Sequence, residues 1–508
     1  MFKLQKKTKP QKLLLNLKKE EKLMKQSSKV NYLFNVSYQV FALLVPLITT
    51  PYLSRVLGAD GIGTYSYTYS IAKYFWLASV IGISTLGTKT IGIWQESKEK
   101  RSDEFWNILS LKAVLSTVML ISYFIYVVFA AKNKTIAALQ SIYLFGAAID
   151  ISWFYQGMED FKKISIRNFI TKILSVICIF LFVKNKNDLP IYIICHAGFL
   201  FLGILIVWIP IKKYIYPPKF KNLKPFKWFL PALILFLPNN ATEFYSVIDK
   251  SMIGWITGSM AQNGYYEQAF KMINMLMTVI TTLSIVMVPK ISREFNNGNK
   301  DVVIKALSKS FKFTFFLGMP MCLGLILITP IFVPWFFGND FSEAIPILQI
   351  LSFLFIFTGI SSVTGIQYLI STNQAIKHII IMLCGLIVNV VLNIIFISKY
   401  QAIGAAIGSF VSEATIMILE LAYLHFTKQY HIKNLLINSK NFTISTLIMG
   451  LAGFVIIKLL PSTVLTMAIA IFICAIVYIG CLILLKEEFI INEIKTIINK
   501  INRHKNTP

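Results

Sequence analysis

Residues 31–86 read NYLFNVSYQVFALLVPLITTPYLSRVLGADGIGTYSYTYSIAKYFWLASVIGISTL. The segment contains two apolar stretches, at about 31–53 and 62–86, which a short polar break separates. Each stretch reaches the ~20 residues that an α-helix needs to cross the hydrocarbon core of a bilayer. The segment therefore predicts two transmembrane helices joined by a tight loop.

The same pattern recurs along the whole chain. Hydrophobic residue types make up 56% of the 508 residues and charged types only 14%, well below the roughly 25% charged residues of soluble domains. We therefore expect an all-α, polytopic transmembrane bundle of about fourteen spans. The remaining twelve are expected at 105–130, 136–157, 164–183, 189–211, 228–253, 264–288, 311–333, 343–371, 374–397, 401–426, 441–460 and 463–485.

The distribution of positive charge predicts an orientation. The net charge is +27, but the Lys and Arg residues lie between apolar spans and not on a soluble basic face, which argues against nucleic-acid binding. Alternate loops are rich in Lys and Arg, as in cytoplasmic loops of membrane proteins. Both termini are therefore expected in the cytoplasm. The outward loops and span ends would hold only Arg55, Lys132, Lys134, Lys184, Lys186, Lys399 and Lys458.

A basic linker divides the chain into two halves of six spans each. Gly63-Thr64-Tyr65 opens the second span and Gly264-Tyr265-Tyr266 opens the eighth, so we expect a parallel repeat with the transport path between the halves. The expected organisation is a basic cytoplasmic tail at 1–30, a first lobe at 31–211, the linker at 212–227, a second lobe at 228–426, two extra spans within 427–485 and a cytoplasmic tail at 486–508.

Two pairs of motifs resemble a known family. The first pair is Pro51–Tyr65 and Ser84–Ile91, and the second is Ile248–Gly254 and Gly264–Lys271. Together they resemble the Wzx-type polysaccharide flippases of the multidrug/oligosaccharidyl-lipid/polysaccharide (MOP) exporter superfamily. The resemblance implies two helical lobes in a V shape around a central cavity in a bacterial cytoplasmic membrane. The implied cargo is an undecaprenyl-pyrophosphate-linked oligosaccharide of a capsule, exopolysaccharide or O-antigen, and the implied partners are polysaccharide polymerase and glycosyltransferases.

Cations within spans are candidates to bind an anionic cargo. Ionisable residues in a membrane are costly and by default indicate a pathway. Lys73 lies near the middle of the second span and Lys271 lies in the eighth, whereas Lys250 and Arg55 lie nearer the outer ends of their spans. A structural ion pair is an alternative, because Lys271 is one helical turn from Glu267. Lys250 has the further alternative of reaching water by snorkelling.

Carboxylates within spans are candidates to couple transport to an ion gradient. Glu243, Asp249 and Glu413 are the candidates for binding H⁺ or Na⁺, because desolvation favours neutralisation of a buried carboxylate. Snorkelling is again the alternative for Asp249. Glu420 shares a helix face with Glu413, and His378 is expected to be a packed polar residue. The six cysteines lie singly, without metal-ligand spacing, so we expect no metal site and no cofactor.

Two other classes of membrane protein remain alternatives. An ion-coupled small-molecule exporter of the same superfamily would favour carboxylates and apolar surface over deep lysines. A multi-span polymerase or ligase would need a sizeable outward loop, and the outward loops here are short, so we expect no enzymatic activity. The segment Gly82–Thr90 misses the GxxxxGK[ST] order of a phosphate-binding loop by one inserted residue, which argues against a nucleotide-driven pump.

Overall fold

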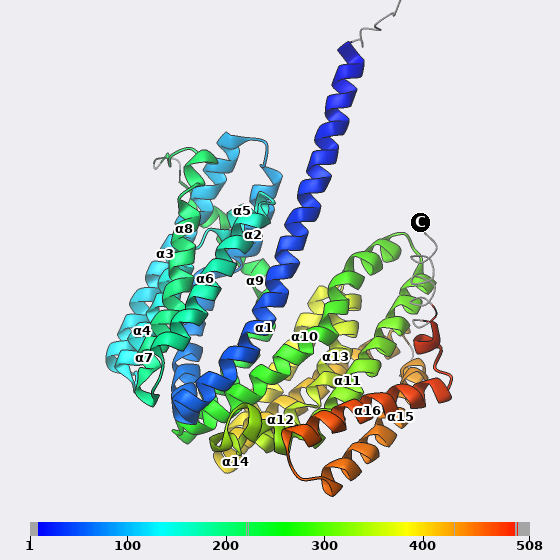
Figure 1. The fold of residues 1–508 in the computed structure, drawn as a ribbon. Coiled ribbons are helices and arrows are strands. Elements are labelled where there is room, and N and C mark those ends of the chain that lie inside the picture. The colour runs from blue at the N-terminus through cyan, green and yellow to red at the C-terminus, as the bar shows by residue number, and fades with distance from the viewer. Residues whose placement is uncertain (1–8, 220, 222, 431, 493–494, 496–508) are drawn as a thin grey trace, which may run out of the picture. The chain divides into compact units, whose positions relative to one another are not determined.

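The computed structural model describes residues 9–219, 221, 223–430, 432–492 and 495, and these residues form helices without any strand (Figure 1). In this part of the chain, 11 helices are long and apolar enough to cross a membrane. Two of them each contain two membrane-length segments, since α1 (Lys9–Val80) is broken at Gly58 and α14 (Ala375–Phe426) at Gln401. Counting these two helices as two spans each, and adding α9 (Phe229–Thr257), gives the expected fourteen spans.

The first compact unit comprises residues 1–49 and 71–239. Buried aromatic side chains form its main core, among them Phe105, Trp153 and Phe154. Helices α3, α4, α6 and α8 run side by side around this unit (Figure 1). Its helices after α1 are α2 (Ile83–Ile93), α3 (Lys98–Phe129), α4 (Lys134–Ile149), α5 (Ser152–Gly157), α6 (Phe161–Phe182), α7 (Leu189–Ile193) and α8 (Phe199–Trp208), with the start of α9.

The second compact unit comprises residues 50–70 and 240–508. Its core lies between α10, α11, α15 and α16 and includes Phe311, Phe315 and Phe442. The expected tenth span is not one regular helix but α12, α13 and the π-helical segment η7, a form that is frequent at functional sites. The helices are α10 (Met260–Asn296), α11 (Lys300–Phe336), α12 (Ala344–Leu351), α13 (Leu354–Ser361), η7 (Ser362–Ile370), α14, α15 (Ile432–Leu459) and α16 (Val464–Leu484).

Polar side chains set the start of several spanning helices. The side chain of Asn133 accepts a hydrogen bond from the backbone N–H of Ile136 at 3.1 Å and caps α4. Thr463 accepts one from Thr466 at 3.2 Å and caps α16. These caps satisfy backbone donors that the helix itself leaves unpaired. The short polar breaks in the sequence therefore define where each span begins.

The two glycine motifs that echo each other in sequence meet in the second unit. A Cβ atom on Gly63 would lie 1.7 Å from the carbonyl oxygen of Met260, and one on Gly264 would lie 2.1 Å from that of Ala59. Only glycine permits two backbones to approach so closely. This contact explains why residues 50–70, which the sequence assigned to the first lobe, cluster with the second unit.

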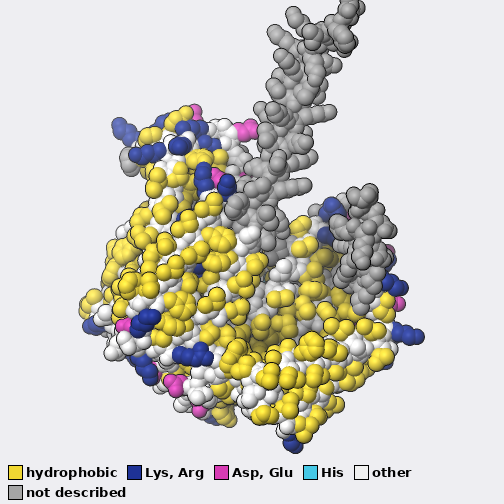
Figure 2. All heavy atoms as spheres, viewed as in Figure 1, with side chains coloured by type: hydrophobic (Ala, Val, Ile, Leu, Met, Phe, Trp, Pro, Cys, Tyr) yellow, Lys and Arg dark blue, Asp and Glu magenta, His cyan; other side chains and the backbone are white. Residues whose placement is uncertain are grey.

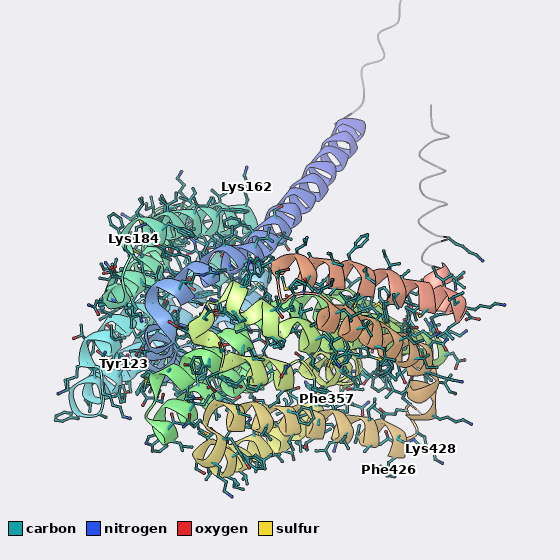
Figure 3. The ribbon with its side chains drawn as sticks, turned by 60° about the horizontal axis from the view of Figure 1, so that its bottom comes forward. Tyr123, Lys162, Lys184, Phe357, Phe426 and Lys428 are labelled. Atoms are coloured by element: carbon teal, nitrogen blue, oxygen red, sulfur yellow. The ribbon has the colours of Figure 1, made fainter. Side chains whose placement is uncertain are left out.

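The outer faces of the helices are apolar, as a bilayer requires. Figure 2 shows hydrophobic side chains across the helix faces and Lys and Arg side chains gathered toward helix ends. Figure 3 labels one such end, where α14 finishes with Phe426, 80% exposed, and is followed by Lys428. Exposed apolar side chains beside terminal cations are the pattern of a helix that meets the membrane interface.

Candidate functional site

Asp249 of α9 forms the centre of a buried polar group in the second unit. Its Oδ2 accepts hydrogen bonds from Tyr266 Oη at 2.5 Å and Ser409 Oγ at 2.6 Å, and its Oδ1 accepts one from Asn393 Nδ2 at 2.6 Å. Asp249 is only 1% exposed, so it does not reach water by snorkelling. All three donors are neutral. We call these residues, together with Asn389, the Asp249 centre.

The break in α14 brings two of these donors together. Asn393 precedes the break at Gln401 and Ser409 follows it, so the two halves of α14 both face α9. Gly408 lies between them, and a Cβ atom there would fall 2.3 Å from Asn393 Oδ1. A glycine at this position therefore keeps the amide of Asn393 beside the carboxylate.

The Asp249 centre has spare hydrogen-bonding capacity. Asn393 Nδ2 also donates to Asn389 Oδ1 at 3.1 Å. Within the described part of the chain, Asn393 Oδ1 is a buried acceptor without a hydrogen-bond partner. Amide, hydroxyl and carboxylate oxygens are the ligands that hard cations prefer. This arrangement can hold a small cation or a proton.

Lys250, the neighbour of Asp249, forms an ion pair. Its Nζ lies 2.7 Å from Glu267 Oε2, and the two side chains are 15% and 18% exposed. Ser66 Oγ donates to the same oxygen at 2.8 Å. The sequence offered Lys271 as the partner of Glu267, one turn along the same helix. In the structure Lys250 takes the contact, and Lys271 acts on Glu267 electrostatically.

Arg55 and Glu243 are two further candidates, and both belong to the second unit. The Arg55 guanidinium donates to the backbone carbonyls of Pro51 and Trp335, which ties the break after the first span to the end of α11. Glu243 is an exposed residue of α9, and its charge acts on Tyr69.

Two further carboxylates come from the second half of α14. Glu413 Oε2 accepts a hydrogen bond from Thr358 Oγ1 at 2.8 Å. Glu420 is fully buried and bonds to Ser361, Thr364 and His378, with 2.7 Å between His378 Nδ1 and Glu420 Oε1. His378 is thus a packed polar residue, as expected. Its partner Glu420 lies against η7, whose Gly365 leaves room for both side chains.

Lys73 belongs to the first unit. Its Nζ lies 3.6 Å from the centroid of the Trp76 ring, a cation–π contact that stabilises a charge in an apolar setting. The structure therefore places Lys73 in one unit and Lys250, Lys271 and Arg55 in the other.

Sequence reasoning found Asp249 and missed its partners. Asn389 and Asn393 are four residues apart in a very apolar span, which puts two amides on one helix face. Amides in such a span are a usable signal for a polar contact. Tyr266 and Ser409 carried no comparable signal, because tyrosine and serine are common in membrane spans.

The sequence matches known proteins over most of its length. A profile of a family described as polysaccharide biosynthesis protein matches residues 28–295. The chain is 25% identical over 415 residues to a putative O-antigen transporter of Escherichia coli (strain K12), covering 80% of this chain and 98% of that protein. It is 24% identical over 415 residues to the capsular polysaccharide biosynthesis protein CapF of Staphylococcus aureus, covering 78% and 98%.

Solved structures share the fold. The lipid II flippase MurJ, in an inward closed conformation, superposes with a TM-score of 0.72 over 90% of this chain and 100% of that chain, at 19% identity. An inward-facing MATE family multidrug resistance transporter of the MOP superfamily gives a TM-score of 0.57 over 77% and 99%, at 15% identity. These likenesses confirm the expected polytopic helical fold. Since the family profile covers more than half of the chain, this protein belongs to the polysaccharide biosynthesis protein family, as its motifs indicated.

Proposed function

We propose that this protein is a flippase for an undecaprenyl-pyrophosphate-linked oligosaccharide. The repeat unit of a capsule, exopolysaccharide or O-antigen would pass by alternating access from the cytoplasmic to the outer leaflet of a bacterial cytoplasmic membrane. Family membership carries the proposal, together with relatives that are named as an O-antigen transporter and a capsular polysaccharide biosynthesis protein. A pyrophosphate and several sugars need a carrier, because transferring charged and polar groups into hydrocarbon is costly.

Lys73 and Lys271 are our candidates for binding the pyrophosphate. A cation held in a span can replace part of the solvation that the cargo loses. Lys250 and Arg55 have protein partners at Glu267 and Trp335, so we assign them to the architecture of the second unit. The Lys73 ammonium lies against the Trp76 ring, and aromatic contact leaves its positive charge in place.

The Asp249 centre is our candidate for the coupling-cation site. A buried carboxylate with neutral partners only is destabilised by desolvation, and binding H⁺ or Na⁺ removes that penalty. The centre joins α9, α10 and both halves of α14. Occupancy would therefore change how these helices pack, which is how a bound ion can bias two conformations of a carrier. Glu243 is exposed and Glu413 is partly exposed, whereas Asp249 is 1% exposed, so Glu243 and Glu413 are the weaker candidates for this role.

The cargo assignment can be tested by complementation. In a strain that lacks this gene, Lys73→Ala and Lys271→Ala should each abolish surface polysaccharide while the protein remains in the membrane. Lys458→Ala, which removes an exposed lysine at the end of α15, is the matched control and should keep normal polymer. Normal polymer in both test variants would contradict the cargo role. Intact polymer with increased retention of cationic dyes would instead indicate a small-molecule exporter.

The coupling assignment needs purified protein in vesicles. Flipping of a lipid-linked oligosaccharide should depend on an imposed Na⁺ or H⁺ gradient, and only one of the two gradients should drive it. Asp249→Asn should abolish that dependence, whereas Asp340→Asn, at an exposed position between α11 and α12, should preserve it. A flipping rate that ignores both gradients would contradict the proposal.

A further inference from the structure

The second unit contains a cavity that no part of the proposed transport cycle uses. It has a volume of about 760 Å³ and lies between α10, α11, α16 and the segment that follows α16. Apolar side chains form most of its wall, including Leu283, Phe313, Phe316 and Ile479. This volume falls within the range of roughly 300–1,000 Å³ that is typical of ligand sites.

Three lysines line the same cavity. Lys290 comes from α10, and Lys305 and Lys309 come from α11, one helical turn apart and therefore on one face. Lys290 follows the apolar stretch 264–288, and the other two precede the stretch 311–333. The cations are thus at the interface end of the spans, whereas Leu283, Phe316 and Ile479 lie deeper along them.

A buried hydroxyl adds a second polar feature. Ser310 lines the cavity and is 1% exposed. Its Oγ has no hydrogen-bond partner among the described residues. A buried donor without a partner costs free energy, so Ser310 marks a polar position behind the cavity wall.

The closing wall of the cavity is held in place by an ion pair. Phe489 and Ile490 supply this wall. Just before them, Glu487 binds Lys312 Nζ at 2.9 Å and Asn441 Nδ2 at 2.7 Å. This pairing anchors the segment after α16 and neutralises Glu487. Among the residues that line the cavity, the charged ones are the three lysines.

We propose that this cavity binds an anionic phospholipid of the cytoplasmic leaflet. The head-group phosphate would lie among Lys290, Lys305 and Lys309, and one acyl chain would fill the apolar part. Basic pockets between transmembrane helices on the cytoplasmic side are suited to anionic head groups. A soluble anion would leave the apolar wall uncovered, and a zwitterionic lipid would bring no net negative charge to the lysines. The inference does not rest on the proposed cargo.

Lipid retention by the full-length purified protein tests the proposal. Native mass spectrometry would compare phosphatidylglycerol with phosphatidylcholine. The variant Lys290→Gln/Lys305→Gln/Lys309→Gln should weaken phosphatidylglycerol binding roughly 100-fold, since each lysine near an anionic head group contributes about a fivefold effect. A control with the same charge change, Lys300→Gln/Lys433→Gln/Lys440→Gln, alters exposed lysines that do not line the cavity and should bind as the wild type does.

A second variant tests the acyl-chain part. Val302 lines the cavity and is 41% exposed, so Val302→Trp should reduce lipid binding by occupying space, without removing charge or disturbing the core. Melting temperatures close to that of the wild type would show that both variants fold. Equal loss of binding in the control, or unchanged binding in the lysine variant, would overturn the proposal. Preferential retention of undecaprenyl phosphate over phosphatidylglycerol would overturn it too, by making the cavity a site for the cargo's carrier lipid.

Discussion

The ion pair between Lys250 and Glu267 gives the sharpest test of the structure. Lys250→Met removes the cation and keeps most of the side-chain volume. Glu267 would then retain Ser66 as a donor at 2.8 Å and the weaker electrostatic effect of Lys271, but it would lose the ammonium at 2.7 Å. A carboxylate in a membrane span without its cation is destabilising. We therefore expect Lys250→Met to lower the stability of the protein. The decrease should be smaller when Glu267 has also been replaced.

The exposure of the two side chains determines how much stability the protein should lose. Removing one partner costs about 3–5 kcal/mol in a fully buried pair, and an exposed pair contributes about 0–1 kcal/mol. The two side chains are 15% and 18% exposed, so we expect about 2 kcal/mol after discounting for solvent. A loss of that size lowers the melting temperature by roughly 4 °C in a large domain.

A double-mutant cycle in detergent measures the coupling. Lys250→Met and Glu267→Gln should each destabilise the protein, and the double variant should lose clearly less than the sum. The double variant should flip the lipid-linked oligosaccharide as the wild type does, because we assign Lys250 to the architecture and not to the cargo. Lys458→Met is the control for replacing an exposed lysine. A coupling energy below about 0.5 kcal/mol would refute the pairing, and a stable but inactive double variant would return Lys250 to the cargo site.

Three further predictions follow from single features of the chain. Gly264→Ala should destabilise the protein by about 1–3 kcal/mol in thermal unfolding, as overpacking does, whereas Gly324→Ala, with nothing within 4 Å, should leave the melting temperature unchanged. Backbone N–H groups of the 184–185 turn hold the pKa of Asp188 below its ordinary value. That stabilisation is present at neutral pH and is lost as the pH falls below about 4. The protection of the turn amides, taken as hydrogen exchange relative to the intrinsic rate at each pH, should therefore fall in acid for the wild type and already be low at pH 7 for Asp188→Asn. Reporter fusions should place the 212–227 linker and the C-terminus in the cytoplasm, and an external signal from either would contradict the orientation.

Local properties of the sequence were enough to predict the helices. Span length and apolar content belong to one segment at a time. The break at Gly58 falls between the expected spans 31–53 and 62–86, and the break at Gln401 falls at the first residue of the expected span 401–426. The irregular tenth span was not predicted. Its division into α12, α13 and η7 accompanies packing of η7 against His378 and Glu420, and Glu420 is 59 residues from its partner Ser361.

In the candidate site, too, the sequence predicted some features and only the structure revealed others. The sequence identified Asp249, Lys250 and Glu267 because charged residues in apolar spans are conspicuous. It did not identify which of them pair, since Asp249 meets Asn393 and Ser409 across 144 and 160 residues. The role of two glycines also became clear only from the structure. In the sequence Gly63 and Gly264 suggested a repeat, and in the structure they are in contact.

The sequence by itself thus determined a polytopic helical protein, its spans and its family, because hydrophobic length and short motifs are properties of contiguous residues. Only the tertiary structure decided that Asp249 is enclosed by neutral donors while Lys250 beside it is neutralised by Glu267. Adjacent residues on a helix point about 100° apart, and their opposite environments depend on which helices pack on each face.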